Sequence, residues 1–172
     1  LILEGFVPFQ REVSVVAARG RDGEFRAWPL TENWHVDGIL SASLAPAALA
    51  EHIADNALSY ARRVAEALDY VGVFALELFL KDGELLANEM APRVHNSGHW
   101  TIEGAETSQF QNHLRAVLGL PLGDTRMLGV ACMQTLSGVI LGAFALTADG
   151  TRSEAAYRTL CGGMVAVLVV AT

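Results

Sequence analysis

The chain has 172 residues, with 12 lysines and arginines against 19 aspartates and glutamates, so its net charge is -7. This length suffices for one domain with a hydrophobic core. The acidic balance argues against nucleic acid as a partner, since nucleic-acid-binding proteins normally present a basic face. Cys132 and Cys161 form neither a disulfide framework nor a metal-binding spacing, which indicates a reducing, cytoplasmic setting. Because the sequence begins at Leu1 with neither a start methionine nor a signal peptide, we expect a segment of a longer chain.

The first forty residues predict a β-meander that runs into a loop. Residues 1–10 have the composition of a buried strand, and residues 11–19 alternate as the next strand. Residues 20–23 have turn composition before a further strand candidate at residues 24–30. Residues 31–39 lack strong periodicity and contain an Asp-Gly pair, so we expect a loop there.

A first amphipathic helix is predicted from Pro46 to about Leu68, with proline at its opening position. Charged residues lie mostly away from its apolar stripe, so we expect the stripe to pack on the sheet and to serve as scaffold. The stripe follows spacings of three and four and consists of Leu49, Ile53, Ala57, Tyr60, Val64 and Leu68.

A second helix is predicted over residues 103–118, with Gly119 and then Pro121 as its stop. Its expected apolar stripe consists of Phe110, Leu114, Val117 and Leu118. Its expected exposed residues are Gln109, Gln111 and His113.

Between the helices, residues 74–80 and 85–90 are short apolar-rich runs around residues 81–84, which is the composition of a β-hairpin. Each run has one acidic residue in its middle, Glu77 in the first and Glu89 in the second. Two glutamates on the solvent-exposed face of an ordinary hairpin would have no catalytic or metal-binding role. Two glutamates that reach one cation would suit magnesium, which prefers oxygen ligands and is often carried by a nucleotide.

The length of the turn decides between these two interpretations. A two-residue turn at Asp82-Gly83 would set Glu77 opposite Asn88 and point Glu89 to the other side of the sheet. A three-residue loop, residues 81–83, would instead make Glu77 and Glu89 diagonal neighbours on one face. We prefer the three-residue loop, which predicts a joint carboxylate site.

Residues 91–101, APRVHNSGHWT, leave the second strand at a proline and gather polar side chains within seven positions. A guanidinium offers a planar fork for phosphate or carboxylate, and imidazoles bind or transfer protons near neutral pH. Beside a carboxylate pair, this set favours a site for an anionic substrate. Its members are Arg93, His95, Asn96, Ser97 and His99.

The acids Glu77 and Glu89, the Asn88-Glu89 pair and the run of residues 91–101 together resemble the signature of the ATP-grasp enzymes of purine biosynthesis. Within them, the run is most similar to that of the 5-(carboxyamino)imidazole ribonucleotide synthase family. The resemblance covers residues 1 to about 124. It implies an α+β fold, the carboxy-terminal part of an ATP-grasp enzyme with an antiparallel sheet and packed helices, lacking the amino-terminal domain and most of the lid.

The resemblance also implies roles for individual residues. Glu77 and Glu89 would bind Mg2+, with Mn2+ as an alternative ion, and Arg93 would be the catalytic residue that stabilises carboxyphosphate or the transferring phosphoryl group. Substrate would be bound by His95, Asn96, Ser97 and His99. The nucleotide would be bound by Glu4, Gly5, Phe6, Val7, Glu12, His35, Asn88 and Glu89, with Glu4 to Val7 as the hinge at the adenine and Glu12 at the ribose.

The implied reaction is the ATP-dependent carboxylation of 5-aminoimidazole ribonucleotide with bicarbonate, through carboxyphosphate, in purine biosynthesis. The implied setting is a cytoplasmic homodimer acting on small molecules, with neither nucleic acid nor membrane as a partner. Because the family's lid supplies lysines to the phosphates, we expect this chain alone to turn over poorly. Two alternatives stay open: another ATP-grasp ligase, such as a formate-dependent purine transformylase, and a non-catalytic nucleotide-binding remnant.

The chain divides by composition into residues 1–126, the expected ATP-grasp core portion, and residues 127–172, an apolar tail. Residues 127–148 and 159–172 contain no charged residue, and the basic, glycine-containing segment that closes the active site in the resembling family is missing. The tail is open to three interpretations: a membrane span, which its polar and glycine residues disfavour; a buried hairpin or disordered end; and a reading-frame error or divergent splice.

Overall fold

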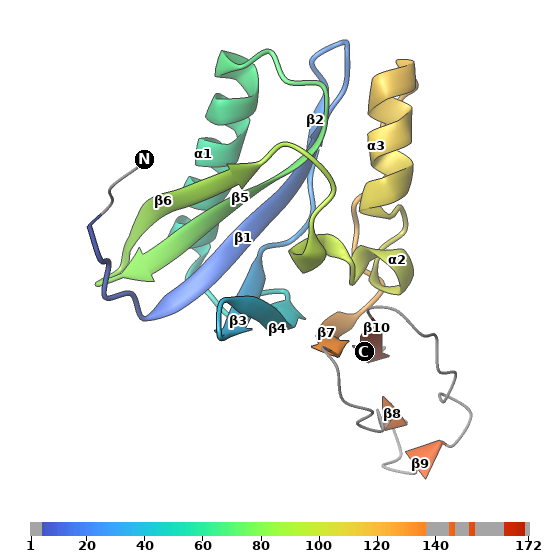
Figure 1. Cartoon of the computed structure of the whole chain (residues 1–172). Coiled ribbons are helices and arrows are strands. Elements are labelled where there is room, and N and C mark those ends of the chain that lie inside the picture. The colour runs from blue at the N-terminus through green and yellow to red at the C-terminus, as the bar shows by residue number, and fades with distance from the viewer. Residues whose placement is uncertain (1–4, 137–144, 147–151, 154–163, 171–172) are drawn as a thin grey trace.

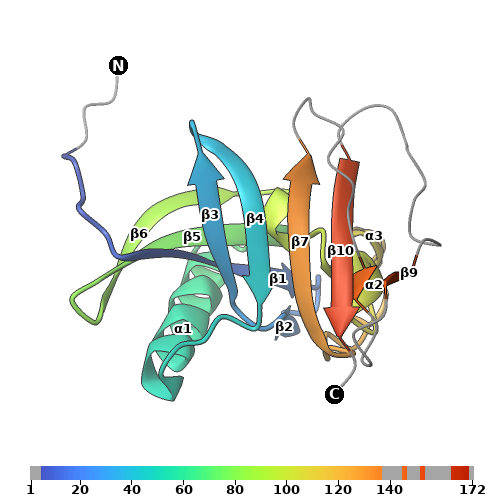
Figure 2. The same cartoon turned by 90° about the horizontal axis from the view of Figure 1, so that it is seen from below.

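The computed structural model describes residues 5–136, 145–146, 152–153 and 164–170. Within them, one antiparallel sheet has the strand order β10-β7-β4-β3-β1-β5-β6, with β2 beside β1 (Figures 1 and 2). The strands of this sheet are β1 (Arg11–Arg19), β2 (Phe25–Ala27), β3 (Thr31–Val36), β4 (Ile39–Ala45), β5 (Gly72–Lys81), β6 (Glu84–Ala91), β7 (Val130–Leu136) and β10 (Met164–Val170). A separate pair consists of β8 (Ala145–Leu146) and β9 (Arg152–Ser153). The predicted α+β class with an antiparallel sheet is confirmed.

Helix α1 (Glu51–Ala67) covers one face of the sheet (Figure 1). Side chains alternate between the faces of a strand, and this face of β1 and β5 carries an apolar set that packs against the helix. Small residues at every fourth position let α1 lie close to the strands. The shared core contains Val13, Val15, Ala17, Ala57, Ala61, Ala65, Phe74, Leu76 and Leu78. The predicted role of this helix as scaffold under the carboxylate hairpin is confirmed.

The opposite face is covered by the 3-10 turn η1 (Asn96–Gly98), α2 (Thr101–Gly104) and α3 (Gln109–Leu118). Two tryptophans, Trp28 and Trp100, are almost fully buried in the core on this side. Figure 1 shows α3 and α1 on opposite sides of the central strands. Toward the other end of the same face, beneath η1, the sheet is polar, and the candidate site lies there.

Helix α1 begins five residues later than predicted and buries a different stripe. The backbone N–H of Ala47 donates to the carbonyl of Leu30, so the segment after Pro46 runs along the sheet before the helix starts. Ile53 and Ala57 are buried as expected, whereas Tyr60 and Leu68 are 37% and 61% exposed. The alanines face the strands because only small side chains fit at that distance.

The second predicted helix is two helices, and the prediction of its buried face was wrong. Ser108 starts α3 with a capping box, in which its hydroxyl accepts from the backbone of Gln111 and its N–H donates to the Gln111 side chain. Gly119 ends α3 with a left-handed φ of 70°, as predicted. The buried residues of α3 are Gln109, Asn112 and Ala116. The exposed residues include Phe110, Leu114 and Leu118.

The predicted loop at residues 31–39 is a β-hairpin made of β3, a turn and β4. Asp37 and Gly38 both have positive φ, 52° and 75°, which matches the two-residue turn that antiparallel strands favour. Sequence periodicity missed the strand because polar Thr31 and Asn33 occupy its buried positions.

The predicted amino-terminal strand is also wrong over its described part. Residues 5–10 form no strand, and Phe6 is 92% exposed. Pro8 cannot donate a ladder hydrogen bond, and the backbone of the segment joins the sheet at Gln10, whose N–H donates to the carbonyl of Leu80. Residues 1–4, including Glu4, lie outside the described residues.

Much of the predicted apolar tail lies outside the described residues. Its described strand β7 pairs with β4 and with β10, so residues 130–136 continue the central sheet. The division at residue 126 and the three interpretations of the tail remain predictions. In the described part of the chain, no helix has the length and apolar character needed to span a membrane.

Candidate functional site

The β5–β6 hairpin sets Glu77 opposite Glu89, by a route that differs from the predicted one. Its turn has two residues, Asp82 and Gly83 with φ of 52° and 81°, and Lys81 pairs with Glu84, so the preferred three-residue loop was wrong. A β-bulge then shifts the register after Leu78 pairs with Ala87, and Glu77 pairs directly with Glu89.

The residue inserted by this bulge is Asn88. In a regular ladder after a two-residue turn, Asn88 would face Glu77 and Glu89 would point away. The bulge places two ladder residues against one on the partner strand. The predicted joint carboxylate face is therefore present, and the bulge creates it.

Strand β1 adds further polar groups to the same face. Ser14 pairs with Glu77, and Glu12 pairs with Asn33 of β3, so these four side chains share a face across three strands. Every one of them is at least 90% buried. Buried polar groups require hydrogen-bond partners, and η1 packs over β1, β3 and β4 to supply some of them.

His95 links the segment after β6 to the carboxylate pair. Its Nε2 lies 3.2 Å from Glu77 Oε1, and its Nδ1 lies 2.9 Å from Ser97 Oγ. Its backbone is held by Gln109, whose Oε1 accepts from the His95 N–H at 2.9 Å and whose Nε2 donates to the His95 carbonyl at 2.7 Å. The sequence placed Gln109 on an exposed face, whereas the structure makes it fully buried.

Electrostatic coupling at the site centres on Glu77. Burial raises the pKa of Glu77 to about 7, and the nearby carboxylates of Glu12 and Glu89 act in the same direction, against smaller opposite effects of His35 and Arg93. Burial lowers the pKa of His95 to about 4, and the positive charges of Arg93, His99 and His35 lower it further. At neutral pH the site therefore holds a neutral imidazole beside a carboxyl group poised to ionise.

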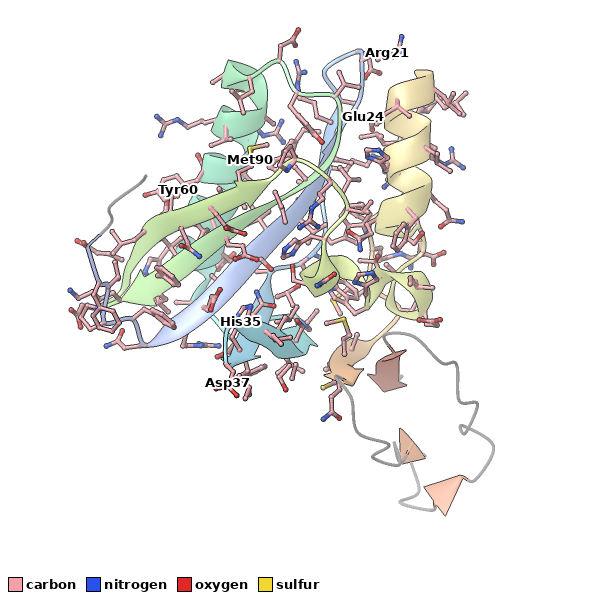
Figure 3. All side chains as sticks on the ribbon, viewed as in Figure 1. Arg21, Glu24, His35, Asp37, Tyr60 and Met90 are labelled. Carbon is pink, nitrogen blue, oxygen red and sulfur yellow. The ribbon has the colours of Figure 1, made fainter. Side chains whose placement is uncertain are left out.

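The other predicted site residues surround this centre. His35 Nδ1 lies 2.9 Å from Glu12 Oε2, which joins β3 to β1 at the rim, and Figure 3 shows His35 on the β3–β4 hairpin. Arg93 is exposed and donates from Nη1 to the carbonyl of Val94 at 2.9 Å. His99 hydrogen-bonds through Nδ1 to the carbonyl of Asn96. Of the nucleotide-binding candidates, Gly5 and Phe6 are exposed and Asn88 is exposed in the bulge.

The structure adds three site residues that the sequence analysis left out: Ser14, Asn33 and Gln109. Ser14 donates to Ser97 at 2.8 Å, and Asn33 donates to Ser14 at 3.0 Å. Ser14 interrupts an otherwise apolar run in β1, and that interruption was the available signal. Asn33 lies in the largely polar segment TENWHV, which was interpreted as a loop.

The donor set fits a hard divalent cation. Among the described residues, Glu77, Glu89 and His95 each offer one ligand atom, and these atoms lie within 4.8 Å of one another. Two carboxylates suit Mg2+ or Mn2+, and remaining positions suit water or phosphate oxygens. An imidazole nitrogen is an uncommon ligand for Mg2+, so the carboxylates are the residues that would hold it.

Comparison with known proteins agrees with this geometry. The profile of the ATP-grasp domain family matches residues 1–110, well over half of the 172 residues, and the chain belongs to the ATP-grasp family. Within that family, the chain is similar to N5-carboxyaminoimidazole ribonucleotide synthases. The one from Pseudomonas aeruginosa is 58% identical over 144 residues, which are 81% of this chain and 38% of the relative.

The chain is also similar to solved structures of N5-carboxyaminoimidazole ribonucleotide synthases. N5-carboxyaminoimidazole ribonucleotide synthetase from Thermus thermophilus superposes with a TM-score of 0.77 at 64% identity, covering 79% of this chain and 38% of the other. An Aspergillus clavatus N5-carboxyaminoimidazole synthase, in complex with ADP and 5-aminoimidazole ribonucleotide, has a TM-score of 0.73 at 34% identity, covering 78% and 37%. This chain thus spans less than two fifths of the length of each of these relatives.

Proposed function

We propose that this chain is the metal- and carboxyphosphate-binding part of an enzyme that carboxylates 5-aminoimidazole ribonucleotide with ATP and bicarbonate. The observation that supports it most is the direct opposition of Glu77 and Glu89 beside His95 and Arg93. The identity of 58% to the Pseudomonas aeruginosa synthase supports the choice of reaction.

The proposed reaction has two steps. A bicarbonate oxygen attacks the terminal phosphorus of ATP, the bond to the bridging oxygen breaks, and carboxyphosphate and ADP form. The substrate amine then attacks the carboxyl carbon, loses a proton, and releases inorganic phosphate. Such transfers ask the protein chiefly for positioning and neutralisation of charge.

Each residue has one role in this proposal. Glu77 and Glu89 bind the Mg2+, which neutralises phosphate charge when it is bound. The Arg93 fork binds the carboxyphosphate or the transferring phosphoryl oxygens. The neutral His95 donates a hydrogen bond to Glu77 and orients it.

The remaining residues bind the two organic substrates. Glu12, His35 and the hinge residues 4–7 contact the nucleotide. The substrate end of the site is shaped by Asn96, Ser97 and His99.

The reaction is tested in a chimera in which this chain replaces the aligned segment of the Pseudomonas aeruginosa synthase. We expect ADP release that requires both bicarbonate and 5-aminoimidazole ribonucleotide, and that Glu89→Gln reduces at least tenfold. Glu84→Gln, an exposed acid of the same strand, is the matched control and should leave the rate unchanged. ADP release that requires formate in place of bicarbonate would indicate the transformylase alternative. If Glu89→Gln and wild type have equal activities, the non-catalytic remnant is the better account.

Two further parts of the proposal concern the setting. We expect the protein to act in the cytoplasm and to form a homodimer, and the exposed apolar side chains of α2 and α3 support a second copy as partner. Ile102, Phe110, Leu114 and Leu118 are between 37% and 68% exposed. Sedimentation equilibrium tests this: Leu114→Glu should shift the mass toward the monomer, and a monomeric wild type contradicts the proposal.

A further inference from the structure

A line of buried polar side chains runs from the carboxylate pair into the sheet. His95 Nε2 meets Glu77 at 3.2 Å and His95 Nδ1 meets Ser97 Oγ at 2.9 Å. Ser14 donates to Ser97 at 2.8 Å. Asn33 Nδ2 donates to Ser14 at 3.0 Å, and Asn33 Oδ1 accepts from Ser43 at 2.8 Å. We call this line the polar chain; its members are Glu77, His95, Ser97, Ser14, Asn33 and Ser43, each exposed by 8% or less.

The polar chain has a direction. The Nδ2 group of Asn33 only donates and its Oδ1 only accepts, whereas a hydroxyl does both. Ser14 accepts a hydrogen bond from Asn33 and donates one to Ser97. Because the Ser97 oxygen accepts this hydrogen bond, its own hydroxyl hydrogen is free to point at His95 Nδ1.

A second, independent donor also points at His95 Nδ1. His95 is the N-cap of η1, and the backbone N–H of Ser97 donates to Nδ1 at 3.4 Å. A backbone N–H cannot reverse its role. Nδ1 must then present its lone pair, and a neutral imidazole with a lone pair on Nδ1 carries its proton on Nε2.

We propose that the polar chain holds His95 in the tautomer protonated on Nε2, so that His95 donates to Glu77 and is not a third ligand of the bound cation. Ser97, Ser14 and Asn33 are then positioning residues that act through His95. The statement about the cation rests on the proposed function, whereas the tautomer stands without it. The arrangement resembles the hydrogen bonds that fix histidine tautomers around metal sites, but here they turn the ring toward the carboxylate.

This arrangement has a consequence for metal choice. Three groups lie close enough to bind one ion, and distance alone does not distinguish the histidine from the acids. With a proton on Nε2 and Nδ1 engaged by Ser97, neither ring nitrogen is free to coordinate. The site is left with oxygen ligands only, which suits Mg2+ and disfavours ions that prefer nitrogen.

The test is the tautomer itself, read from long-range proton–nitrogen correlations of the 15N-labelled chain at neutral pH. His95→Gln identifies the His95 signals. We expect a protonated Nε2 and an unprotonated Nδ1 in wild type, unchanged on addition of Mg2+. A protonated Nδ1, or loss of the Nε2 proton when Mg2+ is added, overturns the proposal.

Ser14→Ala and Ser43→Ala form a matched pair, because both serines are fully buried members of the polar chain. Ser14→Ala removes the donor that directs Ser97, so a fraction of His95 should change to the Nδ1-protonated tautomer. Ser43→Ala keeps every link from Asn33 to His95, so the wild-type tautomer should persist. Equal spectra for the two variants contradict the proposal. Since the readout needs no ATP and no turnover, a failure of the proposed reaction would leave the tautomer result standing.

Discussion

Glu77 and Glu89 face each other across the β5–β6 ladder because Asn88 is the extra residue of a β-bulge. The two acids share one face of the sheet, and burial raises the pKa of Glu77 to about 7. Burial of Glu77, with the carboxylates of Glu12 and Glu89 nearby, disfavours its ionised form. A divalent cation bound by the two carboxylates would offset that cost, which is why the arrangement suits a metal-nucleotide site.

Glu77 should make the protein less stable as the pH rises. Its pKa is raised from 4.5 to about 7, so between these values the folded state keeps a proton that the unfolded state has lost. The contribution of Glu77 to the free energy of unfolding then falls through that window, by up to about 3 kcal/mol. Urea unfolding at intervals from pH 4 to 8 without metal should show that Glu77→Gln removes this decline.

His95 should contribute the opposite slope. Its pKa is lowered from 6.5 to about 4, so between these values the unfolded state binds the extra proton and stability rises with pH. In wild type the two effects oppose each other from pH 4.5 to 6.5. Glu77→Gln should therefore gain stability with pH in this range, and His95→Gln should lose it. Parallel profiles for the two variants would refute this assignment.

Binding of Mg2+ with ATP should release a proton from Glu77 below pH 7. The cation binds the ionised carboxylate, so its affinity depends on deprotonation. Calorimetry at pH 6 in two buffers of different ionisation enthalpy measures the number of protons released. We expect about one proton for wild type and almost none for Glu77→Gln; an equal number for both would mean that the proton comes from elsewhere.

Gln109→Ala should destabilise the fold and loosen His95. The change leaves the backbone N–H and carbonyl of His95 buried without partners, at a cost of about 2–5 kcal/mol. Gln111→Ala on the same helix removes only a partly buried cap contact and should cost about 1 kcal/mol. Chemical denaturation compares the two, and similar losses would show that Gln109 is not a special support.

Arg93→Lys should separate chemistry from stability. Arg93 is exposed and makes one hydrogen bond to its neighbour's carbonyl, so the free energy of unfolding should change by no more than about 0.5 kcal/mol. In the chimera, loss of the planar fork should reduce kcat by roughly 100-fold. An unchanged kcat would remove Arg93 from the catalytic step.

The sequence predicted those parts of the fold that depend on local pattern. Strand β1, the turn that follows it, the helix that supports the hairpin and the left-handed Gly119 stop all follow from periodicity and turn composition. The predicted face shared by Glu77 and Glu89 is also correct. Its cause could not be predicted, because a bulge at Asn88 depends on the partner strand and leaves no local signal.

The errors share a physical reason. Asn33 and Gln109 are polar residues at buried positions, and each is stabilised there by groups distant in sequence: Asn33 by Ser14 and Ser43, and Gln109 by the His95 backbone. A pattern that assigns polar residues to the surface must place both outside. Their burial identifies both residues as part of the hydrogen-bond network around His95.

The central claim is that Glu77 and Glu89 together bind the magnesium of a nucleotide. The most direct measurement is the dissociation constant of Mg2+-ATP for the wild-type chain, Glu89→Gln and the control Glu84→Gln, by calorimetry at pH 8, where Glu77 is ionised. The account predicts that Glu89→Gln binds at least tenfold more weakly, about 1.4 kcal/mol or more, while Glu84→Gln matches wild type. Equal affinities for Glu89→Gln and wild type would contradict it.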